Sequence, residues 1–139
     1  CIGSIHPWRP LLTDVAENAL KAAFHDNRFP KLTTKELKES EISLHISVLS
    51  PQVQMSFSSE DNLISQLRVG VDGLVLTEGK RRGVFLPIVW DTLPEPRQFL
   101  RQLKLKAGLH EDYWSNNLQI FRYVTRGVSS ESNSAETNL

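Results

Sequence analysis

The residue type with the most reactive chemistry in this chain is a thiol, and it occurs once, at Cys1. The thiol opens the segment Cys1-Ile2-Gly3. A cysteine beside glycine, close to basic groups or to a helix terminus, can have a lowered pKa and act as a nucleophile. The alternative is a small buried apolar residue at a strand end, because free cysteine is among the most buried residue types. The sequence leaves both interpretations open.

A base for such a thiol could come from His45, which shares the polar face of a predicted strand with Ser43 and Ser47. If that polar face lines a cleft that also holds Cys1, the imidazole could accept the proton of the thiol. The alternative is a solvated strand face, which is the usual situation in antiparallel sheets.

Two charged segments could bind anions. Asp26-Asn27-Arg28-Phe29-Pro30 combines an acid, a guanidinium and an aromatic ring, and the fork of Arg28 could hold a carboxylate or another anion. An Asp26–Arg28 pair that stabilises its own turn is the alternative. The basic segment Lys80-Arg81-Arg82 is interpreted as a solvated turn rather than a nucleic-acid site, because the whole chain carries no net charge.

Composition narrows the class of protein. The chain has 139 residues, with 16 Lys+Arg against 16 Asp+Glu and one cysteine. An intrachain disulfide is excluded, a Cys/His zinc cluster is not expected, and no cofactor motif is present. No apolar run reaches the ~20 residues that a membrane-spanning helix needs. We therefore expect a cytoplasmic protein with no membrane or nucleic-acid partner and no metal.

The first half of the chain predicts two helices and a strand. An apolar face with helical spacing begins after Pro10 and ends before Asp26. A Thr33–Glu36 capping box starts a short helix, and strict alternation over residues 42–48 predicts a half-buried strand, with a second short strand at Met55 and Phe57. Six apolar residues share one face of the first helix: Leu12, Val15, Ala16, Ala19, Leu20 and Ala23.

The second half predicts a helix capped by Ser59, with Leu63, Ile64 and Leu67 facing the core. A β-hairpin over residues 74–86 should turn at Gly79. A helix from Pro96 to Ala107 with Gly108 at its C-terminus and a last strand near residues 118–124 follow. The three tryptophans, Trp8, Trp90 and Trp114, are expected to pack in the core or between subdomains, although Trp8 could instead line a pocket. Hairpins and separated helices favour an α+β fold with a mixed, largely antiparallel sheet.

Several strings, taken in order, resemble the AMMECR domain family, whose bacterial and archaeal members are called AmmeMemoRadiSam system protein A. The similarity covers about residues 1–126. The strings that carry it are Cys1-Ile2-Gly3 with Pro10-Leu11, Ala16-Glu17-Asn18-Ala19, Asp26-Asn27-Arg28-Phe29-Pro30, Ser47-Val48-Leu49-Ser50-Pro51, Gly70-Val71-Asp72-Gly73-Leu74, Arg81-Arg82-Gly83-Val84-Phe85-Leu86-Pro87 with Val89-Trp90, and Leu103-Lys104-Leu105-Lys106-Ala107-Gly108-Leu109 with Trp114.

The resemblance implies two unequal lobes in one domain over residues 1–126. The polar composition of the remaining residues, 127–139, predicts a disordered tail. The family hallmark is a Leu-Arg-Gly-Cys-Ile-Gly string, of which Cys1-Ile2-Gly3 is the second half, so the resemblance implies an N-terminally incomplete copy. His45 does not belong to the family pattern. Family-matching positions that could form a cleft for a small polar ligand are Cys1, Gly3, Asn18, Asp26, Arg28, Ser47 and Arg82.

Two functions follow from the resemblance. The first is an accessory protein of undefined activity with a polar ligand or substrate cleft near Cys1, where thiol chemistry would make Cys1 the catalytic residue. The second is a non-catalytic module that docks a Memo-like or radical SAM partner protein through an exposed apolar or Trp-lined surface. The sequence does not decide whether the chain is an enzyme.

Overall fold

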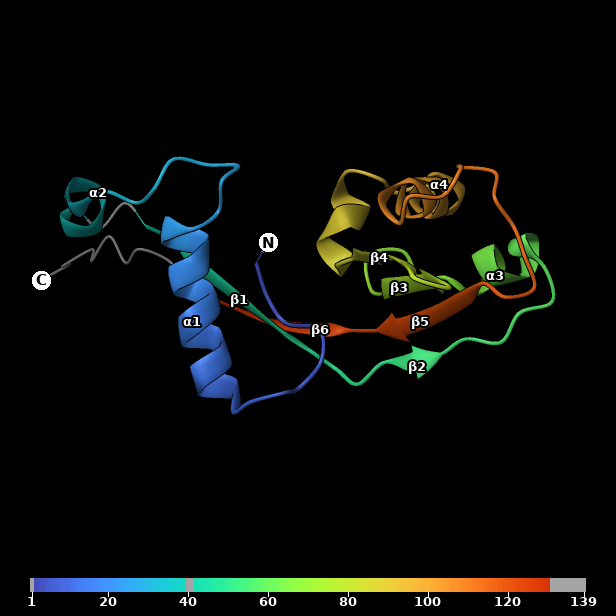
Figure 1. Ribbon diagram of the computed structural model, residues 1–139, viewed down its shortest axis with the longest axis horizontal. Coiled ribbons are helices and arrows are strands. Elements are labelled where there is room, and N and C mark those ends of the chain that lie inside the picture. The colour runs from blue at the N-terminus through green and yellow to red at the C-terminus, as the bar shows by residue number, and fades with distance from the viewer. Residues whose placement is uncertain (1, 40–41, 131–139) are drawn as a thin grey trace, which may run out of the picture. The chain divides into compact units, whose positions relative to one another are not determined.

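A computed structural model describes residues 2–39 and 42–130 of the chain (Figure 1). The chain forms two compact units of unequal size. The first unit combines residues 1–47 with residues 127–139, and the second unit runs from Val48 to Arg126. Helices and antiparallel strand pairs make up an α+β fold, as the sequence predicts. Among the described residues, no helix has the length and apolar character that crossing a bilayer requires.

The second unit is built on a four-stranded sheet with the order β2-β5-β3-β4. Its strands are β2 (Val53–Gln54), β3 (Gly73–Glu78), β4 (Arg81–Phe85) and β5 (Gln119–Tyr123). The β3–β4 hairpin turns at Gly79, whose φ of 58° falls in the left-handed region that glycine adopts without strain. The second predicted strand, expected at Met55 and Phe57, corresponds to β2 and begins two residues earlier, at Val53.

Local signals fix the helices of this unit. Ser59 accepts a hydrogen bond from the Asn62 amide at 3.1 Å and begins α3 (Glu60–Gln66). The helix α4 (Pro96–Lys106) begins with proline and ends before Gly108, whose φ is 78°. A 3-10 helix, η1 (Pro87–Asp91), precedes it, and α4 lies over β3 and β4 (Figure 1).

The core of the second unit forms between its sheet and its helices. Trp90 and Phe99 stack with ring centroids 3.7 Å apart, and Trp90 donates a hydrogen bond to the Asp72 carbonyl at 2.7 Å. Trp90 is buried as predicted, and Trp114 is half-buried against the same core. Residues with fully enclosed apolar side chains include Leu63, Leu74, Leu76, Phe99, Leu100, Leu103 and Ile120.

The first unit contains α1 (Leu11–Phe24) and α2 (Thr34–Lys38). The paired strands β1 (Leu44–Leu49) and β6 (Thr125–Ser130) each have residues in both units, because the chain is divided after Ser47 and after Arg126. The predicted capping box is present, because the Thr33 hydroxyl accepts from the Glu36 amide while Glu36 accepts from the Thr33 amide. The predicted helix after Pro10 is also confirmed.

The apolar face of α1 is partly covered and partly exposed. Every residue of α1 is described and none is buried, and Leu12 and Leu20 are 85% and 57% exposed. Trp8 is 66% exposed, so it is not a core tryptophan. Helical periodicity identifies an apolar face, but burial requires a partner surface, and buried hydrophobic residues among those described all belong to the second unit.

The predicted polar tail also begins too early. Residues 127–130 lie in β6, where the hydroxyl of Ser130 accepts a hydrogen bond from the Leu44 amide at 2.9 Å. The rest of the predicted tail, residues 131–139, is outside the described residues. A serine-rich strand is stabilised by its pairing partner, which local composition does not reveal.

Candidate functional site

A group of polar side chains links the N-terminal loop of the first unit to α1. We call Ser4, Arg9, Asp14, Glu17 and Asn18 the polar cluster. Asp14 Oδ1 accepts hydrogen bonds from Ser4 Oγ at 2.8 Å and from Arg9 Nε at 2.7 Å. Asn18 Nδ2 donates to Ser4 Oγ at 3.4 Å, and a terminal nitrogen of Arg9 donates to Glu17.

Local structure explains why these groups converge. Asp14 and Asn18 are four residues apart on α1, so both project from the same face as Glu17. The chain reverses direction just before Pro10, the N-cap residue of α1, and this places Arg9 beside the first turns of the helix. The cluster therefore depends on the position at which α1 begins.

The guanidinium of Arg9 is the central group. Its side chain is 9% exposed, and its second terminal nitrogen is buried without a hydrogen-bond partner among the described residues. The Trp8 ring lies against this guanidinium, 4.2 Å from its carbon, and the indole N–H donates to Ser4 Oγ at 3.2 Å. A buried N–H donor without an acceptor is energetically costly, so this nitrogen is suited to an acceptor supplied by a ligand.

The charges of the cluster are unequal. Arg9 supplies one positive charge, whereas Asp14 and Glu17 supply two negative charges. Hydrogen bonds from Arg9 and then from Ser4 hold the pKa of Asp14 below its usual value, so this carboxylate is ionised at neutral pH. Glu17 is the more accessible acid, with 51% of its side chain exposed against 19% for Asp14.

Two of the residues predicted near the site belong to the segment before Ser4. Gly3 is exposed, and a Cβ built on it meets open space among the described residues. Cys1 lies outside the described residues, so the prediction of a reactive thiol there remains a prediction.

Asp26 and Arg28 form a pair within their own turn. Arg28 donates from Nε and a terminal nitrogen to the two oxygens of Asp26 at 2.9 and 2.7 Å, and its amide donates to Asp26 Oδ1 at 3.1 Å. The Arg28 hydrogen bonds lower the pKa of Asp26 to about 2. Of the two interpretations of this segment, the self-stabilised turn is the arrangement seen in the structure.

The remaining predicted residues are dispersed. Ser47 is half-buried in β1, and Arg82 is exposed in β4 of the second unit. His45 is exposed and lies 2.6 Å, Nδ1 to Oγ, from Ser129 in β6. Of the predicted residues that are described, only Asn18 belongs to the polar cluster.

Four members of the cluster are not predicted from the sequence: Ser4, Arg9, Asp14 and Glu17. The available signal was the spacing of Asp14, Glu17 and Asn18 at i, i+3 and i+4, directly after an arginine that precedes the helix. From the sequence, the two acids are assigned only to the positive end of the helix dipole, because the path of the N-terminal loop is not visible there.

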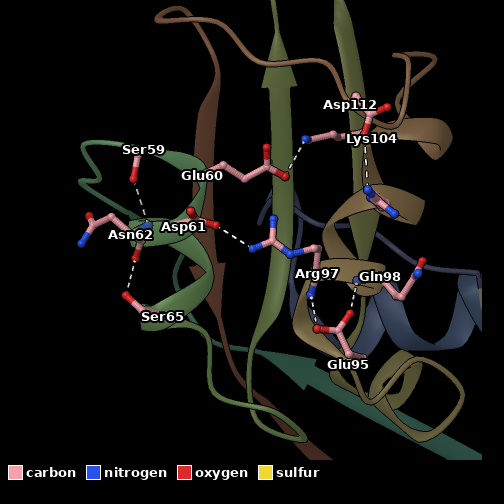
Figure 2. A network of polar contacts seen from close by, with 11 residues as sticks. Ser59, Glu60, Asp61, Asn62, Ser65, Glu95, Arg97, Gln98, Lys104 and Asp112 are labelled. Atoms are coloured by element: carbon pink, nitrogen blue, oxygen red, sulfur yellow. Dashed lines mark hydrogen bonds and ion pairs between the residues drawn. The ribbon is translucent and has the colours of Figure 1, made fainter.

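A second polar network joins α3 to α4 in the second unit (Figure 2). Arg97 pairs with Asp61 at 2.6 Å, and Lys104, which is fully buried, pairs with Glu60 at 3.0 Å. The Lys104 ammonium also lies 5.7 Å from the Trp114 ring centroid. Because this buried charge has a carboxylate partner and an aromatic neighbour, the network has the character of a structural link between two helices.

Metal ligation is not supported by the arrangement of acidic and histidine side chains. Within residues 2–39 and 42–130, no group of three or more His, Cys, Asp or Glu side chains is placed to hold a metal ion. The polar cluster is therefore the candidate site that the described geometry supports best.

The fold is a two-unit α+β domain that carries the polar cluster in its first unit. Comparison with known proteins identifies the family of this domain. The AMMECR1 family model matches residues 1–128. The chain belongs to the AMMECR1 family.

Curated relatives include proteins from Thermofilum pendens and Methanothermobacter thermautotrophicus, each 36% identical over 129 residues. These alignments cover 88% of the chain and 58% and 64% of the respective relatives, so the chain spans about three fifths of their length. A Thermotoga maritima relative is 36% identical over 127 residues, covering 89% of the chain and 66% of the relative. The crystal structure of the uncharacterised protein PH0010 from Pyrococcus horikoshii is similar, with a TM-score of 0.84 and 28% identity, over 94% of this chain and 64% of that one.

Proposed function

We propose that this AMMECR1-family chain binds a small polar ligand at the polar cluster. The observation that carries the proposal is the buried terminal nitrogen of Arg9, which has no acceptor among the described residues. The other hydrogen-bonding groups of Arg9 are occupied by Asp14 and Glu17, so the guanidinium is held in a fixed orientation with one donor edge remaining. A ligand oxygen that reached this nitrogen would supply the acceptor that it lacks among the described residues.

Thiol chemistry is the catalytic version of this proposal. Cys1 is three residues before Ser4 in the same segment, and a reducing, cytoplasmic setting would keep it as a thiol. A nucleophilic Cys1 should react with iodoacetamide near neutral pH and show a thiolate pKa well below ~8.5. Slow alkylation that accelerates only at high pH would exclude the catalytic version and leave ligand binding intact.

Ligand binding itself is tested with a thermal-shift screen of small polar compounds on the intact chain. The matched pair of variants is Arg9→Gln and Arg28→Gln, since Arg28 is also in the first unit but is paired within its own turn. Compounds that stabilise the parent chain should stabilise Arg28→Gln equally and Arg9→Gln not at all. Circular dichroism must show that Arg9→Gln retains its helices. A screen without any stabilising compound, or hits insensitive to Arg9→Gln, would contradict the proposal.

A docking role is the second candidate, and the exposure of α1 favours it. Leu12 and Leu20, eight residues apart on one helix, are both more than half exposed, and the exposed Trp8 lies in the same unit. Clustered apolar exposure is typical of interaction surfaces. If this surface docks a Memo-like or radical SAM partner, purified partner should bind the parent chain and lose affinity for Leu12→Ser. Equal recovery with both chains, or none with either, would count against docking.

A further inference from the structure

The charges of the polar cluster restrict which polar ligand it can accept. Asp14 and Glu17 outnumber Arg9, so the cluster carries a net negative charge when both acids are ionised. A ligand with only a carboxylate would be drawn to the guanidinium but repelled by two carboxylates nearby. A ligand with only an ammonium group would leave the buried nitrogen of Arg9 without an acceptor.

The positions of these groups place a donor next to an acceptor. The two terminal nitrogens of Arg9 belong to one planar guanidinium; one donates to Glu17, and the other is the buried unpaired nitrogen. A ligand oxygen on the unpaired nitrogen would therefore lie close to the Glu17 carboxylate, which is half-exposed and open to a second cation.

We propose that the ligand of the polar cluster is a small zwitterion of the α-amino acid type, with its carboxylate on Arg9 and its ammonium group on Glu17. This inference rests on the proposed function, because it names the chemical class bound at the same site. The carboxylate supplies the missing acceptor, and the ammonium restores the balance of charge that the carboxylate alone would worsen.

Trp8 provides an intrinsic reporter of this binding. Its ring contacts the guanidinium, its N–H is hydrogen-bonded to Ser4 of the cluster, and most of its surface is exposed. An oxygen arriving beside Arg9 changes the surroundings of the indole, so the Trp8 Nε1–H signal in a ¹H–¹⁵N NMR spectrum should shift. The equivalent signal of Trp90, which is buried in the second unit, serves as an internal control.

The test titrates the intact chain with four probes: free glycine, N-acetylglycine, glycinamide and acetate. Free glycine carries both charges, and each of the other probes lacks one. We expect glycine to shift the Trp8 signal at a concentration roughly tenfold lower than any of the others, which corresponds to about 1.4 kcal/mol. The Glu17→Gln variant should bind glycine and N-acetylglycine equally, and Arg28→Gln should behave as the parent chain.

The outcomes separate the two proposals. If N-acetylglycine or acetate binds as well as glycine, recognition of the ammonium group is refuted while the polar-ligand site stands. If glycinamide binds as well as glycine, the carboxylate contact to Arg9 is refuted. If no probe binds but the broader screen yields a ligand lost in Arg9→Gln, only the zwitterion assignment is overturned. If neither experiment yields a ligand, both proposals are overturned.

Discussion

Leu63 and Leu12 both lie on an apolar helix face predicted from the sequence, but their burial differs in the structure. The same substitution at each leucine provides a test. Leu63 in α3 is fully buried, whereas Leu12 in α1 is 85% exposed. Truncation of a buried leucine to alanine costs about 2–5 kcal/mol of unfolding free energy, because transfer energy is lost and a cavity remains. Leu63→Ala should fall in this range.

The expected cost at Leu12 follows from its exposure. Full burial of a leucine side chain is worth about 1.5–3 kcal/mol, and Leu12 has only a small fraction of its surface covered. Leu12→Ala should therefore change stability by less than about 0.5 kcal/mol, with part of the loss offset by the higher helix propensity of alanine.

Urea unfolding measures both variants. In chains that also carry Trp8→Phe, fluorescence comes from Trp90 and Trp114 and monitors the second unit. Far-ultraviolet circular dichroism monitors the helices of both units. If Leu12→Ala shifts either transition as far as Leu63→Ala does, the apolar face of α1 is packed in solution, and the reasoning from exposure is refuted.

Three further predictions test particular contacts. A Cβ on Gly83 would lie 2.9 Å from the Leu103 carbonyl oxygen of α4. Gly83→Ala should therefore lower the unfolding free energy, measured by urea titration, by about 1–3 kcal/mol. Gly3→Ala is the control and should be neutral, because a Cβ there meets open space. Burial raises the pKa of Tyr123 to about 12, so the phenol loses its proton at lower pH in the unfolded chain than in the folded chain. The free energy of unfolding should therefore fall as the pH rises from about 10 towards 12. Tyr123→Phe should abolish this dependence on pH. The pKa of Asp26 is lowered to about 2 from its ordinary value of 3.8, so its pairing with Arg28 should stabilise the fold fully above pH 3.8, and this stability should be lost as the pH falls through about 2. In Arg28→Gln, NMR titration of Asp26 should give a pKa close to 3.8. An unchanged pKa in this variant would contradict the role of the pair.

Local signals in the sequence were sufficient for most elements. Ser59 and Thr33 cap helices as predicted, and Gly79 and Gly108 adopt the left-handed backbone that their turns require. Such signals succeed because the interactions that fix a cap or a tight turn lie within a few residues of one another. Leu63 shows that the core of the second unit could be predicted in the same way.

The candidate site was predictable only in part. Asn18 was identified, but Arg9 was not, because its importance comes from a loop that folds back onto α1 and from one nitrogen that this fold leaves buried and unpaired. The segment Asp26–Arg28 carried the stronger local signal, and it forms a pair that satisfies itself. The residue types in a sequence segment do not show which acidic and basic side chains pair with one another in the fold.

Periodicity, caps and turns along the amino-acid sequence are sufficient to predict the helices, most strands and the α+β class, and the order of its motifs predicts the family. The folded chain is needed to show that Leu12 and Leu20 are exposed, that residues 127–130 form a strand, and that Arg9 lies between two carboxylates. Burial, strand pairing and charge balance are properties of surfaces brought together from distant positions, so no local pattern contains them.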